Sequence, residues 1–223
     1  PLSMPCQLPE SDSDIPLAYY GESHIGRLKT VYRRGLGFRY GRQMQTIAGV
    51  HFNLSFSDDF WAWKAALGGH PDDADDRLIR DHGYFNTIRN FRRIQWLIML
   101  LTGSSPSVDE SFRLLATDRF TVTGRTRLAE GATSLRMSDL GYQSATQESI
   151  NICFNRLDTY CDTLSNAVHH PGPTYEVLGL KDDHGFKQLN TAVLQIENEY
   201  YSSIRPKRIQ RSGERPVRAL INL

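Results

Sequence analysis

The chain has 223 residues, of which 39% are hydrophobic and 23% are charged, a composition typical of one globular domain or one domain and part of another. The 26 basic and 25 acidic residues leave a net charge of +1, which argues against a protein dedicated to nucleic acids or membrane surfaces, but not against a local basic patch. The longest apolar run, WLIMLL at 96–101, is too short to span a bilayer. Three cysteines without a CxxC pair indicate reduced thiols, as in a cytoplasmic protein.

The first predicted elements are a basic helix and a strand. Residues 24–43 are rich in arginine and tyrosine and loosely helical, although their glycines weaken the second half of the helix. The segment 45–57 alternates as a strand should. One face is apolar and is expected in the core, and the other is polar but carries no Lys or Glu: Val50, Phe52, Leu54 and Phe56 against His51, Asn53 and Ser55.

Two further helices and two β segments follow. An acidic loop at 70–76 leads into a helix predicted near 77–102, with Gly103 at its end. The segment 119–126 has β character, and a second helix is predicted to begin at a capping box of Ser144 and Gln147 and to end at HHPGP. Residues 192–204 alternate as a strand and lead into a basic loop. Helices between separated strands predict an α+β fold.

Four groups of residues suggest chemistry, and each has a plainer interpretation. The basic-aromatic run 27–42 suits nucleic acid, a small carboxylate or a phosphate, or it is a solvated helix face. His51 suits a metal or a structural role, and Arg136 suits a carboxylate or an ion pair with Asp139. In the fourth group, at 195–211, Glu197 and Glu199 suit magnesium or acid–base chemistry and the basic residues suit phosphate, or both sets are solvent-facing; the basic residues are Arg205, Lys207, Arg208 and Arg211.

In combination, several blocks of this sequence resemble bacterial glutamate–cysteine ligase, of the type found in enteric and related proteobacteria. The blocks occur in the family's order and span nearly the whole chain: PLSMPC (1–6), GRLKTVYRRGL with RYG (26–41), MQTIAGVHFNLS (44–55), GYFNTIRN (83–90), ATSLRMSDLGYQ (132–143), and VLQIENEYYSSIRPKR with RSGE (193–214). The resemblance implies that residues 1–223 are the central part of a single catalytic domain whose N- and C-terminal portions are missing.

The resemblance also implies a fold and a reaction. The family fold, related to glutamine synthetase, is a curved and mainly antiparallel sheet with helices packed outside, which this chain would form incompletely. The reaction is the ATP-dependent joining of the glutamate γ-carboxylate to the cysteine amine through γ-glutamyl phosphate, the first step of glutathione biosynthesis. ATP and Mg²⁺, or Mn²⁺ in its place, would be the cofactors, in the cytoplasm, without nucleic acid or membrane partners. The oligomeric state is left undetermined, and the chain alone is predicted to be inactive.

The residues that match the family's motifs receive roles by resemblance. His51 would contact the metal, whereas Arg33 and Arg136 would hold substrate α-carboxylates. The cysteine side-chain pocket would contain Tyr32, Leu36, Gln45, Tyr142 and Tyr201, with Tyr142 as a mobile lid. From their charge, Arg205, Lys207 and Arg208 would steer the ATP phosphates, and Glu197 and Glu199 are assigned structural roles.

Two alternative functions stay open on the sequence. One is a related carboxylate–amine ligase that uses another amine or another carboxylate. The other is a nucleic-acid-binding module that uses the Arg/Tyr-rich segment 27–42.

Overall fold

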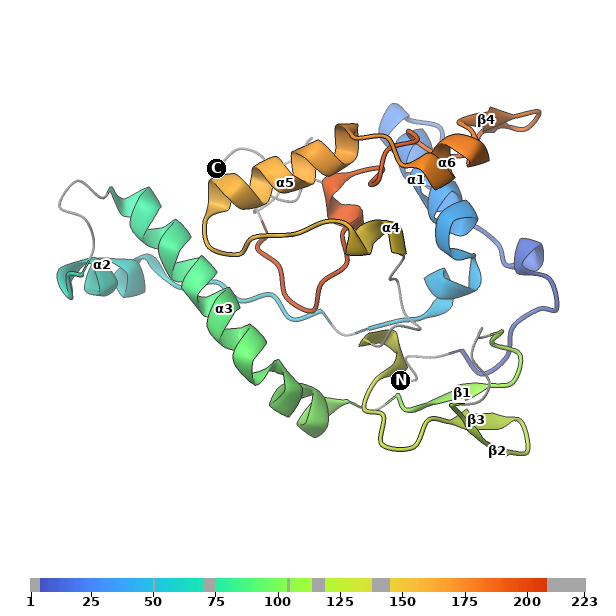
Figure 1. Cartoon of the computed structure of the whole chain (residues 1–223), viewed down its shortest axis with the longest axis horizontal. Coiled ribbons are helices and arrows are strands. Elements are labelled where there is room, and N and C mark those ends of the chain that lie inside the picture. Colours follow the sequence, from blue (N-terminus) through green and yellow to red (C-terminus); the bar gives the residue numbers. More distant parts are fainter. Residues whose placement is uncertain are drawn as a thin grey trace.

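Helices make up most of the regular structure in the computed structural model, which describes residues 5–49, 51–69, 75–103, 105–113, 119–137 and 145–207 (Figure 1). The α-helices in these ranges are α1 (His24–Tyr40), α2 (Asp58–Ala66), α3 (Asp76–Thr102), α4 (Ala145–Glu148), α5 (Leu157–His169) and α6 (Pro173–Leu178). Single 3₁₀ turns lie before, between and after these helices in the chain: η1 (Asp12–Asp14), η2 (Gln43–Thr46), η3 (Leu135–Met137) and η4 (Glu197–Glu199). None of the helices in the described part of the chain is long and apolar enough to cross a membrane.

The strands are short and form two small antiparallel sheets. One sheet has the order β1-β3-β2, from β1 (Ser107–Asp109), β2 (Thr121–Thr123) and β3 (Thr126–Leu128), and the other pairs β4 (Lys181–Asp182) with β5 (Gly185–Phe186). The larger sheet lies at the opposite end of the molecule from α2 (Figure 1). Helices with antiparallel strands agree with the α+β prediction. The large curved sheet is not formed within the described residues.

The two long predicted helices are confirmed, and each begins at a side-chain cap. Ser23 Oγ accepts a hydrogen bond from the Gly26 amide at the start of α1, and Asp75 Oδ1 accepts one from the Leu78 amide at the start of α3. The Gly103 amide donates to the Met99 carbonyl at the end of α3. The predicted β segment near 119–126 is also confirmed, as the β2–β3 hairpin.

Helix α2 is not anticipated by the sequence patterns, because its stabilisation comes from an aromatic cluster with α3. Its cap, Ser57, accepts from the Phe60 amide. The Trp61 ring fits over Gly83 of α3, where any β-carbon would collide with it, and it packs 4.9 Å from the Tyr84 ring. Only contacts between residues more than 20 positions apart reveal this helix pair.

Two hydrophobic clusters form the core of the described residues. The larger joins α3, α5 and the chain at 193–194: Phe85, Ile88, Phe154, Tyr160, Leu164, Ala167, Val193 and Leu194. The smaller joins η2, β1 and η3: Met44, Ile47, Val108, Phe112 and Leu135. The second cluster matters for the site, because it fixes the ends of the two segments that carry Arg136 and His51.

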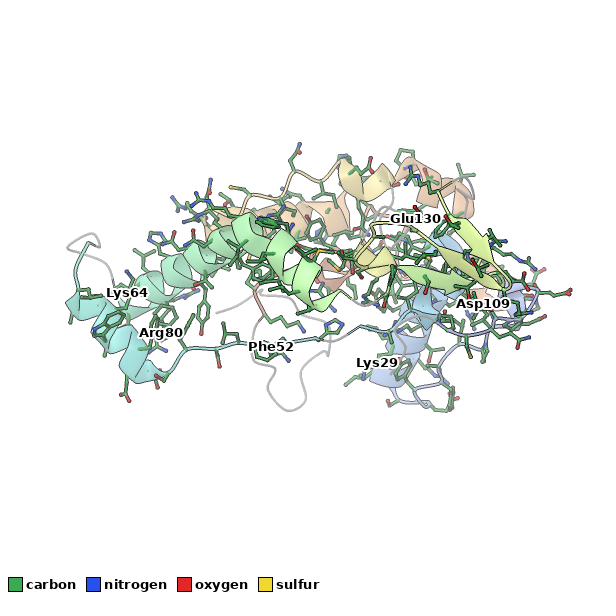
Figure 2. All side chains as sticks on the ribbon, turned by 90° about the horizontal axis from the view of Figure 1, so that it is seen from below. Lys29, Phe52, Lys64, Arg80, Asp109 and Glu130 are labelled. Atoms are coloured by element: carbon green, nitrogen blue, oxygen red, sulfur yellow. The ribbon has the colours of Figure 1, made fainter. Side chains whose placement is uncertain are left out.

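The strand prediction at 45–57 is wrong for the described residues of that segment. Residues 43–46 form η2, and the chain beyond it pairs with no strand. Phe52 and Leu54, expected in the core, are 87% and 61% exposed. In Figure 2, Phe52 lies on a length of chain that runs between α2 and the part of the molecule that contains α1. Val50 lies outside the described residues.

The strand prediction at 192–204 is also wrong, because the side chains at 192–196 are all buried instead of alternating. The chain there is irregular and passes into η4. The helix expected from Ser144 is interrupted: α4 is a single turn, and α5 begins only at Leu157. The Gln147 amide makes long-range hydrogen bonds instead of the predicted capping contact, and Ser144 lies outside the described residues.

Candidate functional site

Arg136 is the best-anchored of the sequence-predicted site residues. Its neighbour Leu135 is buried in the smaller core cluster, so the position of η3 is fixed. Arg136 Nη1 donates to the Ile47 carbonyl at 2.7 Å. The chain passes so close to the guanidinium that a β-carbon on Gly49 would lie 2.9 Å from Arg136 Nε. The half-buried arginine is therefore held against the segment that leads to His51.

His51 lies close to several positive charges. It is exposed and makes no hydrogen bond or ion pair with the described residues. Partial desolvation lowers the pKa of His51, and the charges of Arg136, Lys207 and Arg205 lower the pKa further. The imidazole is therefore neutral at pH 7, in the form that can accept a hydrogen bond or bind a metal ion. The shared electrostatic influence places these four side chains in one region.

This region, taken alone, suits an anion better than a cation. No group of three or more His, Cys, Asp or Glu side chains that could hold a metal is found in the described residues. Mg²⁺ prefers oxygen ligands, and the groups acting on His51 are cations. The described residues therefore do not fit a magnesium ion by themselves, and the metal role of His51 stays a prediction.

Tyr201 lies beside Arg136 and forms one wall of the region around Arg136 and His51. The guanidinium carbon of Arg136 lies 5.8 Å from the Tyr201 ring centroid. The Tyr201 hydroxyl lies 3.0 Å from Met137 Sδ and 3.4 Å from the Arg136 carbonyl, both in η3. With its hydroxyl directed at η3, Tyr201 offers mainly its ring to a ligand.

The predicted residues of α1 are linked to the same region through η2. Leu36 is buried, and Tyr32 and Arg33 are half-buried. The Gln45 side-chain amide donates to the Arg33 carbonyl at 3.0 Å, which ties η2 to the middle of α1. The Arg33 guanidinium has no hydrogen bond or ion pair within the described part of the chain, so it remains available to an anion.

A buried ion pair between Arg39 and Glu199 fixes α1 against η4. Their side chains are 0% and 1% exposed, and Arg39 Nη1 lies 3.2 Å from Glu199 Oε1. The guanidinium also donates to the Gln188 side chain and the Asn190 carbonyl, and its carbon lies 3.9 Å from the Tyr175 ring centroid. Burial raises the pKa of Glu199, whereas Arg39 opposes that shift. These contacts agree with the structural role predicted for Glu199.

The three residues predicted from their charge to bind phosphate differ in how far their side chains are already hydrogen-bonded within the protein. Arg205 Nη1 donates to the Asn198 and Tyr200 carbonyls, so this half of its guanidinium supports the main chain. Lys207 is exposed and makes no hydrogen bond or ion pair with the described residues. Arg208 and Tyr142 both lie outside the described residues.

The basic run 27–42 does not form a continuous binding face. Arg27 pairs with Glu22, and Lys29 lies 5.4 Å from the centroid of the Tyr20 ring. Arg39 is buried against Glu199, and two further arginines donate to backbone carbonyls: Arg34 to those of His184 and Phe186, and Arg42 to those of Ser13 and Ile15. Most of these cations thus fasten other segments to α1, which weakens the nucleic-acid interpretation.

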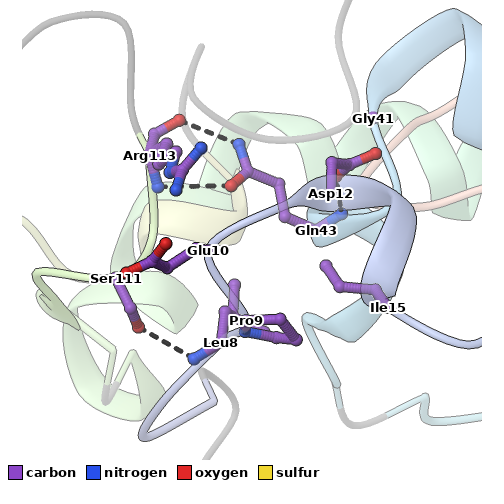
Figure 3. Close-up of a pocket in the computed structure, with 9 residues that line it drawn as sticks. All are labelled: Leu8, Pro9, Glu10, Asp12, Ile15, Gly41, Gln43, Ser111 and Arg113. Atoms are coloured by element: carbon purple, nitrogen blue, oxygen red, sulfur yellow. Dashed lines mark hydrogen bonds between the residues drawn. The ribbon is translucent and has the colours of Figure 1, made fainter.

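Two cavities lie among other elements. One of about 200 Å³ is lined by the N-terminal segment, where the Leu8 amide donates to Ser111 Oγ and the Gln43 side chain bonds both the amide and the carbonyl of Arg113 (Figure 3). Many of its polar groups are hydrogen-bonded to one another, which is typical of a place where two segments of the chain pack together. The other, of about 290 Å³, lies between α2 and α3.

The sequence patterns did not indicate the residues that hold the segments of the candidate site against one another. Gly35 makes room for the Gln195 side chain, whose amide nitrogen lies 3.4 Å from the Tyr32 carbonyl, and Gly49 makes room for Arg136. Gln147 links Tyr40 to Tyr201. The glycines were visible in the sequence, but nothing local showed that large side chains from distant segments lie against them.

The chain is similar to known proteins over nearly its whole length. The chain is 52% identical over 220 residues to a glutamate–cysteine ligase of Hahella chejuensis and 50% identical over 226 residues to one of Alcanivorax borkumensis. It covers 41% and 42% of these relatives, and they cover 98% of the chain. A crystal structure of the Francisella tularensis glutamate–cysteine ligase in complex with AMP matches 96% of the chain and 41% of its own length, with a TM-score of 0.84 and 38% identity.

The chain thus spans less than half the length of these relatives. The family model for glutamate–cysteine ligase matches residues 1–223, the whole of the chain. The chain belongs to the glutamate–cysteine ligase family.

Proposed function

We propose that the complete protein containing this chain joins the γ-carboxylate of glutamate to the amine of cysteine, with cleavage of ATP to ADP and phosphate. The observation that carries the proposal is the anchored Arg136 beside Tyr201 and His51, in a chain whose whole length matches the family. The AMP bound to the Francisella tularensis relative supports a nucleotide as co-substrate.

The reaction requires two transfers. A carboxylate oxygen of glutamate attacks the γ-phosphorus of ATP, and ADP leaves with the electron pair of the broken P–O bond. The cysteine amine then attacks the acyl phosphate carbon, phosphate leaves, and the amine loses a proton. The protein contributes mainly by positioning the reactants and by stabilising developing negative charge with cations.

Arg136 and Arg33 are proposed to hold substrate carboxylates. Guanidinium groups bind carboxylates through paired hydrogen bonds, and the Ile47 carbonyl with Gly49 fixes the orientation of Arg136. Arg33 has no competing partner among the described residues. Each arginine would then serve one of the two amino-acid substrates.

The cysteine side chain is proposed to lie in the niche of Tyr32, Leu36, Gln45, Tyr142 and Tyr201. To select cysteine over serine, the niche must leave a serine hydroxyl, placed where the thiol would lie, without a hydrogen-bond partner. The buried Leu36 and the Tyr201 ring suit that requirement. Tyr142 lies outside the described residues, so its role as a lid rests on the sequence match.

Lys207, with Arg205 and Arg208, is proposed to act on the ATP phosphates. Lys207 is the better-supported member, because the carbonyls of Asn198 and Tyr200 already accept from Arg205. Mg²⁺ remains a predicted cofactor, but its ligands beyond His51 would come from outside the described residues. Because the chain covers 41% of a relative, it is proposed to be the central part of one catalytic domain and inactive alone.

The test is ADP release by the full-length protein with glutamate and cysteine. Cysteine-dependent ADP release is expected, and its absence would refute the proposal. Replacing cysteine by 2-aminobutyrate or glycine separates this activity from that of a related ligase that uses another amine. The isolated 223 residues should give no turnover in the same assay.

A further inference from the structure

The Gln147 side chain has a buried position and long-range contacts that the reaction outlined above does not use. It is 7% exposed, although α4 is only a single turn. Its Nε2 donates to the Tyr40 hydroxyl at 2.7 Å, and its Oε1 accepts from the Tyr201 amide at 3.2 Å. Gln147 therefore joins α1 to the wall of the candidate site.

The direction of this hydrogen-bond chain is set at its far end. The Tyr40 hydroxyl donates its single proton to Glu199 Oε1 at 2.8 Å, so its oxygen must accept from Gln147. Burial and the charge of Glu199 raise the pKa of Tyr40, and the hydroxyl keeps its proton. The amide nitrogen of Gln147 consequently faces Tyr40, which leaves the amide oxygen for the Tyr201 N–H.

Tyr201 is held at two points. Gln147 fixes its main chain, and Met137 Sδ lies 3.0 Å from its hydroxyl. We infer that Gln147 is a positioning residue that sets the Tyr201 ring beside Arg136 and so shapes the niche for the amine substrate. This inference rests on the proposed function, because it assigns the niche to cysteine.

The first test compares the wild-type full-length protein with Gln147→Met, which keeps the side-chain length but removes both hydrogen bonds. Losing a buried hydrogen bond and displacing Tyr201 should raise the KM for cysteine about tenfold. The kcat and the KM for ATP should stay unchanged, because neither depends on this wall. A purely structural role would change all three constants together or lower only the melting temperature.

A second variant, Gln147→Glu, should replace the hydrogen bonds of glutamine only at low pH, when its carboxyl is protonated. When protonated, the new carboxyl can donate to Tyr40 and accept from the Tyr201 amide, as glutamine does. When ionised, it is an acceptor facing the Tyr40 oxygen and close to the Glu199 carboxylate. The other titratable or charged groups around it are Arg39, Tyr175 and Tyr201. The KM for cysteine should be near wild type at low pH and rise with pH.

The outcomes separate the two proposals. A wild-type protein without cysteine-dependent ADP release overturns both, because the positioning role presupposes the niche. Wild-type turnover with an unchanged cysteine KM in Gln147→Met, or with an equal rise in the KM for ATP, overturns only the positioning role. If Gln147→Met does not fold, Tyr40→Phe replaces it. A rise in the cysteine KM alone then supports the inference, and any other result overturns it.

Discussion

Two regions of the molecule differ in how completely they satisfy their own groups. At the contact of α1 with the chain at 188–201, Arg39, Glu199 and Gln195 are buried and hydrogen-bonded within the described residues. Along the segment 47–57, by contrast, Phe52 is 87% exposed and His51 makes no hydrogen bond with the described residues. In the first region, the buried polar groups named above therefore have partners within the protein. In the second, these two side chains are exposed in the described part of the chain.

The largest effect on activity is expected from Arg136→Ala in the full-length protein. Removing one partner of a desolvated carboxylate contact typically costs 2 kcal/mol or more, so kcat/KM should fall at least about thirtyfold. ADP release measures the effect, and a modest fall in melting temperature is expected alongside it, because the Ile47 carbonyl loses its donor. Arg27→Ala is the matched control, because Arg27 forms an exposed pair with Glu22. Equal activities in the two variants would remove Arg136 from the site.

At the buried contact of α1 with residues 188–201, Glu199→Ala should lower the free energy of unfolding by about 3–5 kcal/mol. The substitution leaves Arg39 charged and buried without its partner. Denaturant unfolding of the full-length protein measures this loss. Asp158→Asn removes one partner of an exposed pair and should leave the unfolding curve unchanged. A small loss at Glu199 would mean that the pair is dispensable.

A smaller effect is expected from Gly35→Ala, whose β-carbon would collide with the Gln195 side chain. Overpacking at this contact should lower the free energy of unfolding by about 1–3 kcal/mol. Gly37→Ala is the control in the same helix, where the nearest atom is the flexible Arg42 Cγ at 3.1 Å. That variant should be neutral or gain up to about 1 kcal/mol from helix propensity. Similar losses in both would argue against close packing at Gly35.

For the exposed segment, Phe52→Ser in the isolated 223-residue chain should change the free energy of unfolding by less than about 0.5 kcal/mol, since that ring contributes little to the core. It should instead reduce aggregation, because it removes an exposed apolar group from an unpaired segment. Light scattering measures this change. A cooperative loss of structure would show that Phe52 packs after all.

The smallest effect is at Asp109, where hydrogen bonds from Ser111 and the Arg125 guanidinium lower the pKa to about 2. A carboxyl with a folded-state pKa below its ordinary 3.8 stabilises the native state above that pH, and this contribution is lost as the pH falls towards 2. Carboxyl NMR of the aspartate-labelled protein gives the midpoint. Ser111→Ala should move the midpoint upward; an unchanged midpoint would exclude Ser111 as the main cause.

The sequence predicted elements that depend on local patterns. Helices α1 and α3 carry their own capping residues, and the hairpin near Gly124 carries its own turn. It misassigned the segments at 45–57 and 192–204, because alternating hydrophobicity indicates a strand only when another strand is present to pair with it. At 192–196 the chain is covered on all sides, so every side chain is buried regardless of the alternation.

The candidate site was predicted unevenly for the same reason. His51 and Arg136 were candidates from the residues alone and Tyr201 by resemblance; the structure places them near one another, but their roles stay predictions. Gln147, Gln195 and Gly49 were not identified, because their importance comes from partners 54, 163 and 87 positions away in the chain. Such partners leave no periodic signal in a single sequence.

The close approach of Gly49 to Arg136 has a consequence for any attempt to redesign this enzyme family. With no side chain between them, the main chain at Gly49 lies directly against the guanidinium, which also donates a hydrogen bond to the Ile47 carbonyl. A protein engineer who replaced Gly49 by a larger residue would therefore push the arginine out of this contact. Keeping the arginine in place would then require a second change elsewhere in the chain.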